Sequence, residues 1–297
     1  HYSHSCPTTM TTINSRHWIL FACLSLLWGT SFLNIAVSLR SFTPEQIVGW
    51  RLILAALVLL LVMLYQNKRL PLKLIEWGKF ALFACLGNLL PYWLIAHGQQ
   101  TVTSGMAGLL MAIMPLATML LAHWFIAGEK LTRNRIIGFI MGIMGVAFVL
   151  WPSLVSGNNS WFGALIILLA AFSYAVNTIL LRLQAPPDIS VLSTGIMISA
   201  AIMGAFVWPD MWLVDWQNVA TESLISLIWL GLVPTGLASV IYLTLVKQAG
   251  PHFVSNNNYI IPVIAYLSGA AFLAEPVAVV DFIAMAVILA GIAISRR

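Results

Sequence analysis

Long apolar runs dominate the pattern of hydrophobic and polar positions along this chain. Cutting the sequence where charges or clusters of Gly, Pro and Asn interrupt the hydrophobic residues leaves ten runs. They lie near residues 17–38, 47–65, 80–98, 102–126, 136–152, 161–183, 190–208, 223–246, 252–273 and 276–295. A helix needs about 20 apolar residues to cross a bilayer, and lipid offers the backbone no hydrogen bonds. The pattern therefore predicts an all-α membrane protein with ten transmembrane helices.

Composition narrows the class of protein further. The chain is 61% hydrophobic and 8% charged, whereas an ordinary soluble domain is about 25% charged. So few charges cannot cover the surface of a soluble particle, which excludes soluble enzymes, nucleic-acid binders and disordered chains. Two of the three cysteines lie inside apolar runs, so we expect no disulfide framework, no metal site and no cofactor.

The basic residues are distributed unevenly between the two sides of the predicted membrane. If the N-terminus is cytoplasmic, twelve of the fourteen Lys and Arg residues are cytoplasmic too: Arg16, Lys68, Arg69, Lys73, Lys79, Lys130, Arg133, Arg135, Arg182, Lys247, Arg296 and Arg297. This asymmetry is typical of inner-membrane proteins. We expect a bacterial inner (plasma) membrane protein with both termini cytoplasmic. Residues 1–16 are then a tail, in which residues 1–9 resemble an upstream extension.

The two halves of the chain repeat one another. Pro115 precedes Glu129 by 14 residues and Pro262 precedes Glu275 by 13, and a glycine follows each glutamate after 16 residues. A Leu-Gly pair shortly before a proline also occurs in both halves, at residues 86–87 and 230–231. Such self-similarity predicts a duplicated structural unit.

Each predicted unit contains five helices, over residues 17–152 and 161–295. Five is odd, so the second copy enters the membrane from the opposite side. The fold class expected is thus two inverted five-helix repeats (5+5), with Glu129 and Glu275 on opposite faces. Inverted repeats of this kind are characteristic of secondary transporters.

Several short motifs resemble a known family. The residues that carry the resemblance are Trp28, Gly29, Arg51, Pro115, Gly128, Glu129, Lys130, Leu131, Gly138 and Gly145. In this order and spacing they resemble an EamA-type module of the drug/metabolite transporter superfamily. The resemblance covers residues 17–295, although Ala274 and Pro276 flank the second glutamate where the first copy has Gly128 and Lys130. It implies metabolite export by alternating access.

Polar side chains inside membrane helices should face protein or a wet cavity. They recur at helical spacing on the first, third, fourth, sixth, eighth and ninth predicted helices, which we expect to surround a central cavity with the other helices outside. The candidate substrate-cavity residues are Trp28, Asn34, Asn88, Tyr92, Met111, Tyr174, Asn177, Tyr242 and Tyr259. Helix–helix packing is the alternative role for such residues.

A few further residues could move or carry charge. Pro115 and Pro262 are candidate hinges, with a purely structural kink as the alternative. Arg51 and Asp281 are predicted to be shallow, so that snorkelling or an ion pair is expected, with contact to a substrate carboxylate as an alternative for Arg51. His97 and His123 are placed near helix ends, where they are either interfacial or titrating groups of a proton-coupled carrier.

These features favour one function over its rivals. The first helix lacks the carboxylate of small multidrug relatives, so a neutral, aromatic-lined cavity for an amino acid or similar amphipathic solute is expected. The alternatives are a pore or a lipid-handling protein. An intramembrane enzyme would need a nucleophile with a base, paired carboxylates or metal ligands, and these motifs are missing from the sequence. Gly138 and Gly142 allow either a homodimer or packing within the bundle.

Overall fold

The protein is helical throughout the part of the chain that the structure describes. A computed structural model describes residues 13–156, 160–184 and 188–296. Eight helices in these ranges are long and apolar enough to cross a membrane, and Val279–Ser295 is a shorter apolar helix. The predicted class of all-α membrane protein is confirmed. The predicted number of ten membrane helices is not confirmed, because eight helices in the described ranges meet this criterion of length and hydropathy.

The helices follow one another with short connections. In the first half they are α1 (Ser15–Gly29), α2 (Ser31–Ser38), α3 (Pro44–Tyr65), α4 (Leu74–Ala84), the π-helix η1 (Cys85–Leu89), α5 (Leu90–Gly98), α6 (Ser104–Met111), α7 (Met114–Phe125) and α8 (Arg133–Ser156). In the second half they are α9 (Ser160–Leu183), α10 (Ile189–Val207), the 3-10 helix η2 (Pro209–Trp212), α11 (Thr221–Leu230), the π-helix η3 (Gly231–Leu237), α12 (Ala238–Ala249), α13 (Pro251–Val254), α14 (Asn257–Leu273) and α15 (Val279–Ser295).

The two candidate hinge prolines have different local structures. Pro115 is the second residue of α7, and the preceding helix α6 ends at Met111. Because a proline ring opposes the carbonyl four residues earlier and supplies no N–H, the helix divides there. Pro262 lies inside α14, which continues through it. The equivalent prolines therefore interrupt their helices to different degrees.

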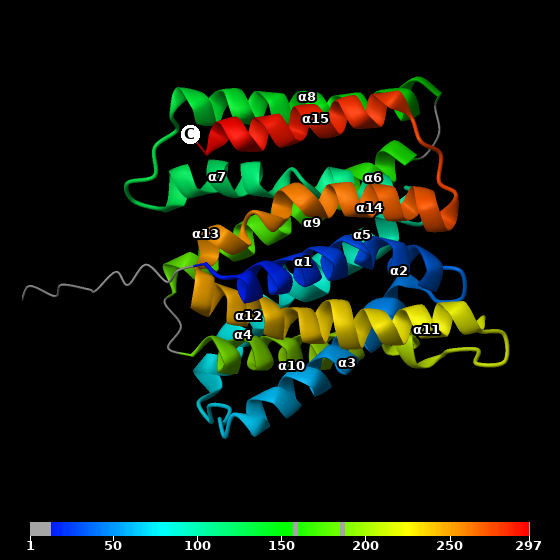
Figure 1. Ribbon diagram of the computed structural model, residues 1–297. Coiled ribbons are helices and arrows are strands. Elements are labelled where there is room, and N and C mark those ends of the chain that lie inside the picture. The colour runs from blue at the N-terminus through cyan, green and yellow to red at the C-terminus, as the bar shows by residue number, and fades with distance from the viewer. Residues whose placement is uncertain (1–12, 157–159, 185–187, 297) are drawn as a thin grey trace, which may run out of the picture.

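The long helices run side by side (Figure 1). α8 and α15 form one edge of the bundle and pack closely on each other. Where they cross, a Cβ added to Gly291 would lie 2.6 Å from the carbonyl oxygen of Gly138, so both glycines allow the backbones to approach. These glycines thus serve packing within the bundle.

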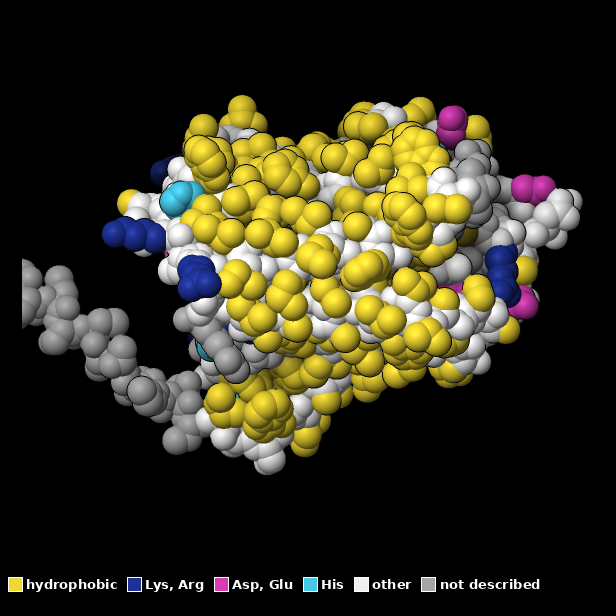
Figure 2. Space-filling view, turned by 90° about the horizontal axis from the view of Figure 1, so that it is seen from above, with side chains coloured by type: hydrophobic (Ala, Val, Ile, Leu, Met, Phe, Trp, Pro, Cys, Tyr) yellow, Lys and Arg dark blue, Asp and Glu magenta, His cyan; other side chains and the backbone are white. Residues whose placement is uncertain are grey.

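The bundle has two chemically different ends. α1 begins and α15 ends at the same end, where Lys and Arg side chains gather, whereas most acidic side chains on the face shown lie at the other (Figures 1 and 2). We call the first the basic end and the second the Glu275 end, because Glu275 lies there between α14 and α15. Between them the face is covered by apolar side chains (Figure 2). Ile140 and Ile143 of α8 are examples of apolar side chains that are half exposed. This surface suits contact with lipid.

The interior brings together the helices that carry polar stripes. α5 packs on α9, α6 on α14, and α1 on both α12 and α14. α3 was expected outside this group, but it packs against α5 and η3 as well as α10. That placement carries the one charged residue of the α3 interior, Arg51, into the bundle.

Candidate functional site

A buried arginine joins the polar residues of several helices. The Arg51 side chain on α3 is 6% exposed. Its Nε donates a hydrogen bond of 2.7 Å to the Thr235 hydroxyl in η3, and its Cζ lies 3.7 Å from the centre of the Tyr92 ring on α5. The expectation that Arg51 snorkels or forms an ion pair is wrong: it turns into the bundle, and none of the three ion pairs in the described ranges includes it.

The π-helix η3 positions the partner of Arg51. Thr235 accepts from Arg51 and donates to the carbonyl of Leu230 at 2.7 Å, so its hydroxyl is oriented by its own chain. Gly231 begins η3 against α3, where an added Cβ would lie 2.7 Å from the Cβ of Leu54. Pro234 inside the segment cannot donate to the helix, which favours the wider π turn. Glycine and proline together therefore set the approach of η3 to α3.

Two tyrosines and an asparagine continue the cluster. The Tyr92 ring meets the Tyr174 ring of α9 edge to face, with 6.5 Å between the centres. One turn along α9, the Asn177 amide lies against Gly87 of η1, and its Oδ1 is buried without a partner in the described part of the chain. Tyr92, Tyr174 and Asn177 were predicted from the polar stripes. The structure places Tyr92 against Arg51 and Tyr174 against Tyr92, and Asn177 lies one turn from Tyr174 on α9.

The two π-helices occupy corresponding positions in the repeated sequence. η1 contains the Leu86-Gly87 pair and η3 begins directly after Leu230 with Gly231. The repeat analysis found both dipeptides without identifying the π-helical turns. Single π turns inside α-helices frequently occur at functional sites. Both π-helices contribute to this cluster, η1 through Gly87 and η3 through Thr235.

Other predicted cavity residues form a second group around α1. The Trp28 ring packs on the Tyr242 ring of α12, with 5.5 Å between the centres. The Asn34 amide donates to the carbonyl of Thr30 in the preceding turn at 2.8 Å. Asn257, which the sequence analysis did not select, is 1% exposed and accepts from the Ser25 hydroxyl of α1. A run of three asparagines at the start of a membrane helix was the signal for it.

The remaining candidates from the polar stripes are dispersed. Tyr259 of α14 lies at the basic end, where the Arg296 guanidinium is 4.6 Å from the centre of its ring. Met111 ends α6 and Asn88 lies in η1, and both are half-buried. None of these three has a described contact with Arg51.

The other candidate charged groups lie near the helix ends. His97 stacks on Trp93 at 4.9 Å between ring centres, in the last turn of α5. His123 is exposed in the last turn of α7, and its Nδ1 lies 2.9 Å from the carbonyl oxygen of Glu129. Asp281 accepts a 2.8 Å hydrogen bond from the Tyr266 hydroxyl. His97 and His123 thus lie in the last turns of α5 and α7, and the partner of Asp281 comes from α14.

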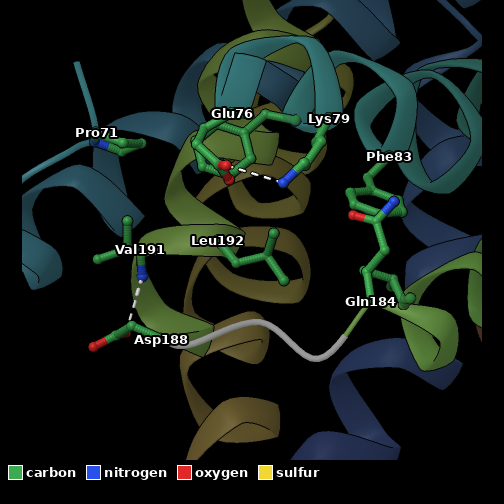
Figure 3. Close-up of a pocket in the computed structure, with 10 residues that line it drawn as sticks. Pro71, Glu76, Lys79, Phe83, Gln184, Asp188, Val191 and Leu192 are labelled. Atoms are coloured by element: carbon green, nitrogen blue, oxygen red, sulfur yellow. Dashed lines mark hydrogen bonds and ion pairs between the residues drawn. The ribbon is translucent and has the colours of Figure 1, made fainter. Parts of the chain in front are cut away.

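A hollow of about 460 Å³ opens at the basic end between α4, α9 and α10. Its lining is Pro71, Glu76, Lys79, Phe80, Phe83, Leu181, Gln184, Asp188, Val191 and Leu192. Glu76 and Lys79 point toward one another across its rim (Figure 3), with 2.9 Å between the charged atoms. Phe83 and Leu181 are four residues from Gly87 and Asn177 on the same helical segments. The hollow thus ends about 6 Å along each helix from the polar cluster.

Asp188 shapes the other side of this hollow. Its carboxylate caps the first turn of α10 by accepting from the N–H groups of Ser190 and Val191. Its second oxygen lies 2.8 Å from the Lys68 ammonium. The hydrogen bond from Lys68, with the backbone N–H groups, lowers the pKa of the Asp188 carboxyl. The carboxylate therefore stays charged to a lower pH than usual.

Comparison with known proteins identifies relatives over nearly the whole chain. The "Uncharacterized transporter YoaV" of Bacillus subtilis is 24% identical over 274 residues, which cover 91% of this chain and 92% of that protein. The "Uncharacterized inner membrane transporter YedA" of Escherichia coli is 26% identical over 280 residues, covering 91% and 87%. A solved crystal structure matches with a TM-score of 0.66 and 18% identity over 95% of this chain and 98% of that chain, which supports the fold.

The model of the EamA-like transporter family matches the chain twice. The two matches cover residues 16–151 and 161–297. They fall on the two halves whose prolines and glutamates repeat, so the same unit is recognised in each. The chain is therefore an integral membrane protein that belongs to the EamA-like transporter family of the drug/metabolite transporter superfamily.

Proposed function

We propose that this protein is a secondary transporter that moves a small organic solute, an amino acid or a similar amphipathic metabolite, by alternating access. In this proposal residues 17–152 and 161–295 are inverted five-helix repeats. The eight long spans together with α14 and α15 make ten crossings. The basic end faces the cytoplasm and transport is directed outward. The family membership and the double match support this function.

The observation that carries the proposal is the polar cluster around Arg51. Arg51 and Tyr92 come from the first half of the chain, and Tyr174 and Thr235 come from the second. Transporters built from repeats bind their substrates where the two repeats meet. Polar and charged groups inside a membrane bundle are costly, and where they occur they commonly mark substrate pathways. The candidate hinge Pro115 lies on α7, which packs on α9 of the second half, and Pro262 lies on α14, which packs on α6 of the first half.

Counterflow in proteoliposomes tests the proposal. We expect purified protein to exchange a labelled solute from a panel of amino acids, aromatic metabolites and cationic dyes with saturation kinetics. Tyr92→Ala and Asn177→Ala should each weaken exchange, because they remove side chains of the cluster. Phe172→Ala is the matched control, since Phe172 lies on α9 beside Ser173 but is 49% exposed on its outer face.

Two results would defeat this function. Flux that rises linearly with concentration and shows no counterflow would identify a pore. Unchanged exchange in both cluster variants, with correctly folded protein, would place the solute site elsewhere.

A further inference from the structure

Arg51 is a buried cation whose terminal nitrogens have no hydrogen bond to the described residues. Its Nε is used by Thr235 and its flat face is covered by Tyr92. The acidic groups of the three ion pairs in the described ranges pair with Lys68, Lys79 and Arg135. A buried charge without an opposite charge is strongly unfavourable. The site thus has the chemistry of an incomplete ion pair.

On this basis we propose that Arg51 recognises a carboxylate group of the transported solute. This inference rests on the proposed transport function and adds the chemical class of the solute. With Nε bound to Thr235, both terminal nitrogens of the guanidinium are left for the two oxygens of a carboxylate. Such a paired geometry is the one in which arginine binds carboxylates most strongly.

The surroundings of Arg51 favour a carboxylate over a phosphate. The cluster contributes one positive charge, from Arg51, and otherwise phenols, a hydroxyl and an amide. A phosphate monoester carries about −1.5 to −2 charges near neutral pH, which one guanidinium does not balance. A carboxylate carries one charge. The match in charge therefore selects a monocarboxylate or the carboxylate of an amino acid.

The neighbouring side chains fit the rest of such a solute. The Tyr92 and Tyr174 rings stand edge to face, with Tyr92 against the guanidinium, so the apolar portion of a solute held by Arg51 would meet aromatic side chains. The unpartnered Oδ1 of the Asn177 amide is an acceptor one turn away on α9. An ammonium or hydroxyl group of the solute could donate to it. The cluster therefore offers a cation at one side and an acceptor at the other.

The hollow at the basic end lies about one helical turn from two residues of the cluster, Gly87 and Asn177. In its lining, Phe83 lies four residues before Gly87 and Leu181 lies four residues after Asn177, about one helical turn in each case. Its charged groups, Glu76 with Lys79 and Asp188 with Lys68, are paired with each other. Arg51, by contrast, has no ion-pair partner among the described residues.

The test compares each carboxylate with its uncharged amide. L-phenylalanine and L-phenylalaninamide, and benzoate and benzamide, are used as probes in counterflow and as ligands that raise the melting temperature of the purified protein. We expect the wild type to prefer the carboxylates at least tenfold. Arg51→Gln should abolish that preference, and Arg51→Lys should retain part of it, because the charge remains and the paired geometry is lost. Arg40→Gln, at an exposed arginine, should change nothing.

The outcomes separate this inference from the proposed function. If the wild type transports amides as well as carboxylates, the carboxylate site is wrong although transport stands. If Arg51→Gln weakens the counterflow and the binding of the carboxylate and of its amide equally, Arg51 has a structural role and the inference fails. If no probe shows counterflow while carboxylates still raise the melting temperature through Arg51, the transport proposal fails and the anion site survives. If Arg51→Gln does not fold, Thr235→Val takes its place in the test, because this variant keeps the charge of Arg51 and removes the hydroxyl that binds its Nε.

Discussion

The two glutamates of the internal repeat make different contacts at opposite ends of the bundle. At one end, Glu275 accepts hydrogen bonds from the N–H groups of Ser104 at 2.7 Å and Gly105 at 3.0 Å. These are the first residues of α6, so a carboxylate from the α14–α15 connection caps a helix of the other half. Negative charge at a helix N-terminus is favourable because the N–H groups there are otherwise unsatisfied.

Glu129 makes no such connection across the repeats. Its carboxylate lies 2.7 Å from the guanidinium of Arg135, six residues further along the chain in the first turn of α8. α7, which precedes it, packs on α9. By contrast, α6 packs on α14 so closely that Gly108 has no room for a Cβ beside Ala265. The fourth and ninth predicted spans are thus tied together at the Glu275 end.

Under the proposed transport function, this difference corresponds to a carrier that is closed at one end. Two equivalent loops that behave alike would fit a static, symmetric bundle. One loop that bridges the halves and one that does not fit a carrier closed at the Glu275 end. In an alternating-access carrier the two repeats exchange roles, so we expect the Glu275 contact to be broken when that end opens.

The largest effect is expected from removing the charge of the bridging glutamate. Glu275→Gln should lower the free energy of unfolding by about 1–3 kcal/mol, because hydrogen bonds to a carboxylate are stronger than those to an amide. Glu129→Gln is the matched control and should cost about 0–1 kcal/mol, since its ion pair is one-third exposed. Denaturant titration in detergent micelles measures both.

Thiol labelling tests whether the Glu275 end opens more often when the bridging carboxylate is lost. A cysteine at Ser104 should react faster with a water-soluble thiol reagent in the Glu275→Gln background, because the Glu275 end opens more often. An equal loss of stability from both glutamate variants would contradict the assignment of one closed end.

The residues before the two glutamates differ in a second way. Gly128 has φ +89° and Ala274 has φ +52°, so both are left-handed, but only glycine adopts that region without strain. Ala274→Gly should therefore stabilise the protein by up to about 1 kcal/mol, and Gly128→Ala should destabilise it by a similar amount. Thermal unfolding of the two variants checks this. A destabilising Ala274→Gly would mean that the alanine methyl group contributes packing that outweighs the strain.

Much of the fold could be predicted from the sequence because lipid restricts the choices. The predicted helix of residues 161–183 corresponds to α9, Ser160–Leu183, since a bilayer leaves few alternatives to a long apolar helix. The division of the predicted helix 102–126 after Met111 was harder to locate. Pro115 marks the break, but the equivalent Pro262 does not divide α14. A proline alone therefore does not determine whether its helix divides.

The candidate site was predictable to a smaller extent. Helical spacing placed Tyr92, Tyr174 and Asn177 on inward faces. It misjudged Arg51, because depth was counted from an expected helix start at residue 47 whereas α3 begins at Pro44. Beyond Arg51 the α3 interior is apolar, so no stripe marked the face on which Arg51 lies. A single charge in an apolar span was itself the usable signal, since such a group has to face protein.

The smallest effect is expected at the basic end, where exposed ion pairs replace the buried contacts of Glu275. Asp188→Asn keeps an amide that can cap α10 and removes the charge facing Lys68. Both side chains are about one-third exposed, so the loss should be below about 1 kcal/mol and should shrink further in 1 M salt.

The pH dependence of this loss follows from the lowered pKa of Asp188. Its stabilisation is fully present above the unfolded pKa of about 3.9 and disappears as the pH falls through the lower folded value. The variant and the wild type should therefore differ in denaturant titrations at pH 7 and converge in strong acid. A loss that exceeds that of Glu275→Gln, or that persists in 1 M salt, would mean that the basic end is fastened as firmly as the Glu275 end, and the contrast between the two ends would not hold.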